Sequence, residues 1–432
     1  KEEVTFSFQD HISKKIPANE SFQEIQKFSL PTGRFSNPYW MEKMPKNNLF
    51  ITENPENLGQ AEISNALTKN VTINFGSIKI DFDIPLQQKT VDPSIGELYE
   101  PFYTVPSFVA NFEQENFIFN NQSKQIAVTV QSFAGKSAPS VSLKTSKDWK
   151  ISPAQKVNFT EVGEKQTLYF QVEPISKSTN SNLEILLESN GETYDQSMHV
   201  VDYPHIDRQI WLKKSQVQVQ NLDLKIPAVR IAYIVGSGDD IPSSLSSIGL
   251  KVDPLDIKNW NAAQLQNYDV LILGIRAFNT QPELAMINQD LWKFVENGGL
   301  IINQYNTNRG LLTNDIAPFP LKLGSGRISE EDAKLKMLVP DHQVFNSPNK
   351  ITEQDFNNWV QERGLYFADS WDEKMIPLLE GNDAGESPKQ GSLLVGKYGK
   401  GTYVYTGLSF FRELPAGVPG AYRLFMNILA LK

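Results

Sequence analysis

Short apolar runs separated by amphipathic segments fill the second half of the chain. Residues 231–235, 270–273 and 300–302 are apolar throughout, and glycine or polar residues follow each run. Strands that are buried on both faces of a parallel sheet have this composition, and the segments between them supply the covering helices. The pattern predicts a doubly wound, flavodoxin-like α/β domain over residues 229–432.

Two segments of this domain have the periodicity of amphipathic helices. Apolar residues at spacings of three and four form one stripe after Pro282, and Gly298-Gly299 ends that segment. A second stripe near the carboxyl terminus predicts a final helix. The stripes consist of Leu284, Ile287, Leu291 and Phe294, and of Leu424, Phe425, Ile428 and Leu429.

Strict alternation of apolar and polar positions characterises the first half. Every second residue of 71–75 and of 78–84 is apolar, and Gly76-Ser77 separates the two runs. This is the pattern of a β-hairpin with one buried face. We expect a β domain over residues 1–103.

Similar alternating runs continue from residue 104 to residue 203, with turn residues between them. They predict an immunoglobulin-like β-sandwich without a disulfide. Residues 204–228 are rich in Lys and Gln and read as a polar linker. In this segment His205 and Asp207 offer too few ligands for zinc, so no metal site is predicted.

Charge and cysteine content narrow the range of functions. The net charge of −9 over 432 residues argues against a nucleic-acid partner. The absence of cysteine excludes thiol nucleophiles and thiolate metal sites, and no apolar run reaches the length of a membrane span. We predict no cofactor. The sequence opens at Lys1 in strand-like alternation and not with a signal peptide, so we expect a piece from the middle of a longer polypeptide.

Polar residues concentrate where the predicted strands end. In a doubly wound sheet the ligand site lies beyond the carboxyl ends of the strands. Arg and Asn side chains there suit carboxylates or sugar hydroxyls, although the same groups also serve to tie loops together. The candidate ligand-binding residues are Arg276, Asn279, Tyr305, Asn306, Asn308, Arg309, His342, Arg363, Arg412 and Glu413.

The stretch from Gly298 to Gly310 resembles the class I glutamine amidotransferase-like fold, in which a strand after a Gly-Gly helix end leads into a turn with a nucleophilic Cys. The position of the nucleophile falls at or near Tyr305 here. A tyrosine with a pKa near its usual value of about 10 is a poor acyl-transfer nucleophile. The resemblance therefore implies the fold without the amidotransferase chemistry, and no catalytic residue is predicted.

Several segments resemble the C-terminal region of large PIG-L (LmbE-like) N-acetylglucosaminyl deacetylase homologues of Bacteroidetes-type bacteria. They are residues 94–102, 201–206, 273–279, 349–367 and 414–425. In that family an N-terminal domain holds zinc through a His-Pro-Asp-Asp motif, which this chain lacks. The resemblance implies an exported protein, periplasmic or at the cell surface, in which this chain accompanies a deacetylase domain of the same polypeptide.

Three functions are compatible with these observations. The first is a non-catalytic region that binds a glycan or amino sugar, or acts as a scaffold. The second is a hydrolase of unknown substrate that uses Ser409 or Tyr305 with His342, and this requires those side chains to converge within about 3 Å. The third is a purely structural or oligomerisation role, which a large exposed apolar patch would favour.

Overall fold

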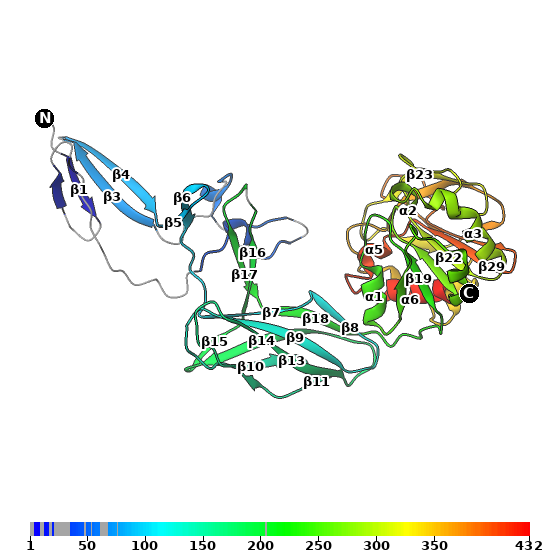
Figure 1. Ribbon diagram of the computed structural model, residues 1–432, viewed down its shortest axis with the longest axis horizontal. Helices are drawn as coiled ribbons and strands as arrows, with labels where there is room; N and C mark the ends of the chain where they lie inside the picture. Colours follow the sequence, from blue (N-terminus) through cyan, green and yellow to red (C-terminus); the bar gives the residue numbers. More distant parts are fainter. Residues whose placement is uncertain are drawn as a thin grey trace.

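The computed structural model describes residues 4–8, 13–16, 20, 35–46, 49–52, 54–60, 68–75, 77–203 and 205–432. Figure 1 shows three parts that follow one another along the chain: N-terminal strands, a β-sandwich, and a C-terminal unit of sheet and helices. Strands far outnumber helices. The predicted β-rich character of the first two hundred residues is confirmed.

The N-terminal strands form a four-stranded antiparallel sheet in the order β2-β1-β3-β4. Phe75 pairs with Ile78 across the predicted two-residue turn, of which Gly76 lies outside the described residues. A separate hairpin follows, made of β5 and β6. The bounds are β1 Val4–Phe8, β2 Ser13–Ile16, β3 Thr68–Phe75, β4 Ile78–Pro85, β5 Gln87–Asp92 and β6 Gly96–Pro101.

The prediction that this hairpin has one buried face is wrong for β4. Its alternating apolar side chains are 39% to 61% exposed, whereas the opposite face carries polar pairs such as Asn70 with Asp83. Alternation specifies which face of a strand is apolar, but burial requires a second layer on that face. The exposed residues are Ile78, Ile80, Phe82 and Ile84.

Two sheets pack face to face to make the sandwich, in the orders β12-β10-β14-β18-β8 and β11-β13-β9-β7. Neighbouring strands are antiparallel except β18 and β8, which are parallel. Alternate residues of both sheets, such as Val128 and Ile185, are fully buried in one common core. The bounds are β7 Phe108–Phe112, β8 Asn116–Phe119, β9 Lys124–Ser132, β10 Ser140–Lys144, β11 Trp149–Ile151, β12 Gln155–Lys156, β13 Lys165–Pro174 and β14 Thr179–Ser189, with β15 Glu192–Tyr194 beside β14.

The predicted linker of residues 204–228 is wrong. Strand β18 (Gln216–Asn221) lies inside the sandwich, between β14 and β8, and buries Val217 and Val219. Strand β17 (Gln209–Lys214) pairs with β16 (Gln196–Val201) in a hairpin that stands beside the sandwich. The Lys- and Gln-rich composition concealed an alternation with a period of two, which is the pattern of a strand.

The C-terminal unit is built on a seven-stranded sheet in the order β20-β19-β21-β22-β29-β28-β26. The first five strands are parallel, and the last two run antiparallel to their neighbours. The bounds are β19 Ile231–Ile234, β20 Val252–Pro254, β21 Val270–Leu273, β22 Leu300–Gln304, β26 Met375–Pro377, β28 Leu393–Tyr398 and β29 Gly401–Thr406.

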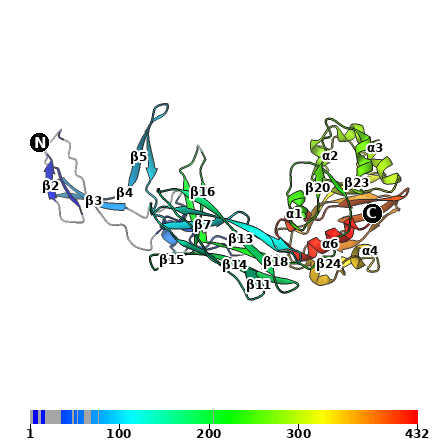
Figure 2. The ribbon, with the colours of Figure 1, turned by 60° about the horizontal axis from the view of Figure 1, so that its bottom comes forward.

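Helices cover both faces of this sheet, as the two views show (Figures 1 and 2). On one face, Tyr233 and Ile272 pack with helices α1 (Ile241–Ser247) and α6 (Pro419–Leu429). On the other face, the neighbouring residues of the same strands, such as Ala232 and Leu271, pack with α3 (Leu284–Glu296). The continuous apolar runs are explained by this burial on both sides.

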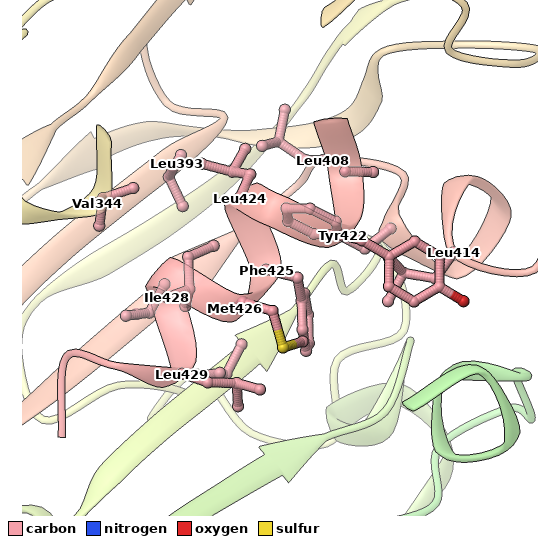
Figure 3. Close-up of a cluster of buried hydrophobic side chains, with 14 of the residues drawn as sticks. Val344, Leu393, Leu408, Leu414, Tyr422, Leu424, Phe425, Met426, Ile428 and Leu429 are labelled. Carbon is pink, nitrogen blue, oxygen red and sulfur yellow. The ribbon is translucent and has the colours of Figure 1, made fainter. Parts of the chain in front are cut away.

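The predicted apolar stripe of the final helix is confirmed. Figure 3 shows Leu424, Phe425, Ile428 and Leu429 of α6 pointing into one buried cluster. Val344 of α4 (Gln343–Asn346) and Leu393 of β28 contribute to the same cluster.

The remaining elements of the unit are short. The segment after Thr352 is the 3₁₀ turn η4 (Glu353–Phe356), for which Thr352 and Asp355 form a capping box. Similarly, the segment before β21 is the 3₁₀ helix η3 (Ala262–Asn267). Two small sheets pair β23 (Leu321–Ile328) with β25 (Gly364–Trp371), and β24 (Leu335–Met337) with β27 (Leu379–Gly381).

The sandwich and the C-terminal unit share an apolar core. Ile118 of β8 belongs to the same buried cluster as α1 and α6. The side-chain amide of Asn116 donates a 2.6 Å hydrogen bond to the carbonyl of Pro415, and the Lys124 ammonium donates to the carbonyls of Ile118 and Ser247. These contacts join the two parts in one packed body.

Candidate functional site

Four parallel strands of the C-terminal sheet end at one edge, and the loops after them meet there. A Cβ atom at Gly236, after β19, would lie 2.0 Å from the carbonyl oxygen of Ile275, after β21. The amide of Ser237 donates a 2.9 Å hydrogen bond to the same carbonyl. Only glycine permits this close backbone approach, which fixes the neighbouring loop that carries Arg276.

Aromatic residues from three separate segments gather at this edge. Tyr305 follows β22, Tyr366 lies in β25, and Phe411 lies in helix α5 (Phe410–Glu413) after β29. The rings of Tyr305 and Tyr366 are nearly parallel with centroids 6.0 Å apart, and the Phe411 ring lies 5.2 Å from that of Tyr305. Tyr305 is buried, whereas Tyr366 and Phe411 are half-buried. We call Tyr305, Tyr366 and Phe411 the aromatic cluster.

Tertiary contacts bring β25 to the ends of the main strands. The amide of Leu365 bonds to the carbonyl of Gly407, and Gly364 forms a bridge with Leu408. The Tyr405 hydroxyl of β29 donates a 2.5 Å hydrogen bond to the carbonyl of Tyr366. Tyr366 is therefore held beside Tyr305, although 61 positions separate them in the sequence.

Arginine side chains border the aromatic cluster. The Arg412 guanidinium lies 4.8 Å from the centre of the Phe411 ring and donates to Glu362 and Gln361. The second oxygen of Glu362 accepts a 2.8 Å hydrogen bond from Arg327. The Arg276 side chain is exposed and makes no hydrogen bond or ion pair with any residue in the described part of the chain.

Positive charge near the cluster affects the Tyr305 hydroxyl. Burial raises its pKa, and the charges of Arg276 and Arg412 oppose that increase. The hydroxyl stays protonated at neutral pH because burial is the larger effect.

Three residues at this edge have left-handed backbone conformations, with φ of 57° at Arg276, 65° at Gln361 and 53° at Tyr366. Side chains larger than Asn rarely adopt this region, and each such residue costs on the order of 1 kcal/mol. At Arg276 the conformation is held by its own amide, which bonds to the carbonyl of Tyr305. Strain of this kind concentrates at functional sites.

Two predicted ligand residues instead connect loops. The Asn279 side chain bonds to the backbone of Thr307 and Arg309, and the fully buried Asn306 side chain bonds to Phe278, Asn303 and Gln304. Their polar atoms are occupied by protein groups. Asn308 and Arg309 are exposed on the adjoining loop and remain available to a ligand.

Arg363 and Glu413 are buried below this surface, so the prediction that they contact a ligand there is wrong. Arg363 donates to the carbonyls of Ala333 and Phe356. Glu413 accepts hydrogen bonds from the Val360 amide at 2.9 Å and the Ser409 hydroxyl at 3.1 Å. Burial raises the pKa of Glu413 to about 8, so it is largely protonated at pH 7.

His342 lies at the opposite end of the sheet from the aromatic cluster. Its ring nitrogen Nδ1 accepts a hydrogen bond from the Val344 amide as a helix cap, and its pKa is lowered by burial and by Lys397 near the start of β29. Within the described residues, no hydrogen bond joins His342 to Ser409 or to Tyr305. The convergence that a hydrolase with these three groups requires is not found.

A separate hollow lies at the amino ends of the strands. It has a volume of about 540 Å³ and is lined by Arg230, Asp269 and Lys432 among others. Asp269 already forms ion pairs with Arg230, at 3.0 Å, and with Lys432, at 3.7 Å. We therefore place the candidate site at the carboxyl ends, where Arg276 has no such partner.

Sequence reasoning missed Tyr366, Phe411, Arg327 and Glu362. Phe411 directly precedes the predicted residue Arg412, so its proximity was a usable signal. Tyr366 and Arg327 lie in strands outside the main sheet, and no local pattern places those strands at its edge. Their position follows from tertiary pairing alone.

Within the described residues, no group of His, Asp and Glu is arranged to hold a metal ion. None of the helices in that part of the chain combines the length and apolarity needed to cross a membrane.

No protein-family model matches the chain, and comparison with curated proteins gives no match. Partial likenesses to solved structures include native alpha-2-macroglobulin from Escherichia coli, from domain MG7 to the C-terminus, with 14% identity and a TM-score of 0.19 over 27% of this chain and 17% of that one. WR4, a Caenorhabditis elegans MSP family member, has 11% identity and a TM-score of 0.17 over 26% of this chain and 97% of that one. The apo-form Calx CBD1 domain has 12% identity and a TM-score of 0.18, over 28% and 100%. These values carry no argument about function.

Proposed function

We propose that this chain is a non-catalytic, glycan-binding region of a sugar N-deacetylase-type protein. The sugar binds to the surface formed by the loops at the carboxyl ends of the parallel strands. Aromatic rings stack on the apolar faces of sugar rings, and arginine donates paired hydrogen bonds to sugar oxygens. The surface offers both kinds of group.

The observation that carries the proposal is the placement of Arg276. Its guanidinium is exposed and unpaired among the described residues, its backbone is left-handed, and it lies beside the aromatic cluster. A cation with no structural partner on a strained turn has no evident role in stability. Contact with a ligand would explain why an arginine stands at this position.

The parent protein and fold class are part of the same proposal. The resemblance of residues 349–367 and 414–425 to PIG-L-type homologues supports an exported protein whose deacetylase domain belongs to the same polypeptide. The five parallel strands with helices on both faces support a doubly wound, amidotransferase-like domain, and the two-sheet sandwich supports an immunoglobulin-like one.

Calorimetric titration of the chain with N-acetylglucosamine oligomers and solubilised cell-wall fragments tests the proposal. We expect binding in the millimolar to micromolar range. Phe411→Ala should weaken it about fivefold, because one stacking contact is worth about 1 kcal/mol.

Tyr169→Ala is the matched control, since Tyr169 is 55% exposed on the sandwich, away from the strand ends. It should leave the affinity unchanged. Absence of binding to every glycan, or equal effects of the two substitutions, would refute the proposal.

The exposed apolar row of β4 favours a second role, in oligomerisation. Four apolar side chains of β4 lie in one exposed row, and large exposed apolar patches mark interaction sites. An uncharged apolar face is complementary to itself, as a twofold contact requires. We propose that it packs against the same face of a second copy.

Sedimentation velocity over a range of concentrations tests this second role. The unmodified chain should dimerise, and the double substitution Ile80→Ser, Phe82→Ser should yield monomer. Val91→Ser, at a 70% exposed position on β5, is the control and should leave the dimer intact. A chain that stays monomeric at all concentrations contradicts self-association.

A further inference from the structure

Arg276 differs from the other arginines near the aromatic cluster in having no carboxylate partner among the described residues. Arg327 and Arg412 share Glu362, whose side chain is only 6% exposed. Arg309 is also exposed, whereas the backbone amide of Arg276 bonds directly to the carbonyl of Tyr305 at 2.8 Å. Arg276 is therefore the available cation next to the cluster.

The carboxylates close to Arg276 are committed to other groups. Both oxygens of Glu362 bond to arginines, at 2.8 Å and 3.3 Å. Asp239 accepts hydrogen bonds from the Tyr233 hydroxyl at 2.5 Å and from the amides of Ile275 and Ile241, each at 3.1 Å. Neither carboxylate is free to turn toward Arg276.

The backbone around Arg276 limits how far its side chain can move from the cluster. Its amide bonds to the carbonyl of Tyr305 at 2.8 Å, and its carbonyl accepts from the amides of Asn279 and Thr280. A planar guanidinium on a fixed backbone matches the two oxygens of a carboxylate, and such charge-assisted pairs are about twice as strong as neutral hydrogen bonds.

We propose that the ligand of this site is an acidic sugar, whose carboxylate pairs with Arg276 while its ring lies on the aromatic cluster. This inference rests on the proposed glycan binding and specifies the class of glycan. It requires no covalent step and no metal.

Matched pairs of small sugars test the inference. N-acetylmuramic acid differs from N-acetylglucosamine by a carboxylate-bearing group, and glucuronate differs from glucose by a carboxylate at carbon 6. At low salt, titration calorimetry should show the acidic member of at least one pair binding about tenfold or more tighter, the effect of one charge-assisted pair. Added salt should reduce that preference.

Arg276→Ala should abolish the preference, so that the acidic and the neutral sugar bind with equal affinity. Arg276→Lys should restore part of it, because it keeps the charge without the paired donors. Arg309→Ala, which removes an exposed arginine of the next loop, should retain it. All three positions are on the surface, and thermal melting verifies that each variant folds.

The possible results separate the two proposals. Equal affinity for acidic and neutral sugars in the unmodified chain overturns the acidic-sugar inference and leaves glycan binding standing. A preference that survives Arg276→Ala overturns the assignment to Arg276. No binding of any sugar overturns the proposed function itself.

Discussion

Glu413 is a carboxylic acid that the fold keeps away from water. Its burial raises its pKa from 4.5 to about 8, so between these values the folded chain binds more protons than the unfolded chain. Stability must then fall as pH rises through this window. The contribution of Glu413 is fully present below pH 4.5 and is lost as pH rises through 8.

Glu413→Gln should remove this pH dependence, since an amide keeps the acceptor oxygen and does not ionise. Denaturant unfolding between pH 5 and pH 9 measures it. We expect the unmodified chain to lose on the order of a few kcal/mol more than the variant over this range. Glu373→Gln, at an exposed position, is the control and should follow the unmodified chain. Parallel pH profiles for Glu413→Gln and the unmodified chain would contradict the prediction.

Lys124 gives the opposite dependence of stability on pH. Burial lowers the pKa of its ammonium from 10.5 to about 8, so the folded chain binds fewer protons than the unfolded chain between these values. The stability should rise with pH from 8 to 10.5, and Lys124→Met should lack that rise. Lys150→Met, whose side chain is 74% exposed, is the control. The same rise in Lys124→Met would exclude Lys124 as its source.

At the scale of elements, β18 is the strand whose role most changes the description of the chain. It lies between β14 and β8 and buries Val219 completely. Val219→Ala should destabilise the chain by about 2 kcal/mol, because it removes two buried methyl groups and leaves a cavity.

Val201→Ala is the matched control, since Val201 is 43% exposed at the end of β16. It should change the free energy of unfolding by less than about 0.5 kcal/mol. If residues 216–221 were a linker, the two substitutions would have equal, small effects in urea unfolding.

At the scale of the whole molecule, the shared core around Ile118 joins the sandwich to the C-terminal unit. Gly417 allows the close contact, since a Cβ there would lie 2.6 Å from the terminal methyl of Ile118. Two parts joined through a common apolar core should unfold together. We expect one calorimetric transition for both.

Ile118→Asp should split that transition into two. A buried charge at the junction disrupts the shared core, whereas the sandwich and the C-terminal unit each keep a core of their own. Val162→Asp, at a 68% exposed position of the sandwich, should leave a single transition. Two transitions in the unmodified chain would show that the parts are thermodynamically independent.

Local pattern was sufficient to predict the three central strands β19, β21 and β22 of the C-terminal sheet and the helices α3 and α6. Runs such as residues 270–273 are apolar because both faces are covered, and the stripe at Leu424 and Ile428 follows the helical period. Local pattern did not separate strand β18 from a linker, because only Val217 and Val219 carry its alternation and the residues around them are polar.

The sequence also indicated where the candidate site lies, since the carboxyl ends of parallel strands share one edge. It did not distinguish residues that face solvent from residues that connect loops. Asn306 and Arg276 both follow predicted strands in polar loops. The side chain of Asn306 makes three hydrogen bonds, whereas that of Arg276 has no partner among the described residues.

By itself, the sequence determined the period of each segment, the faces that are apolar, and the absence of cysteine chemistry, because these depend on neighbouring residues only. The tertiary structure decided which apolar faces are covered, as α6 is and β4 is not, and which polar groups remain free. It also placed Tyr366 and Phe411 beside Tyr305. Burial and partnership depend on residues distant in the chain, and local pattern carries no information about them.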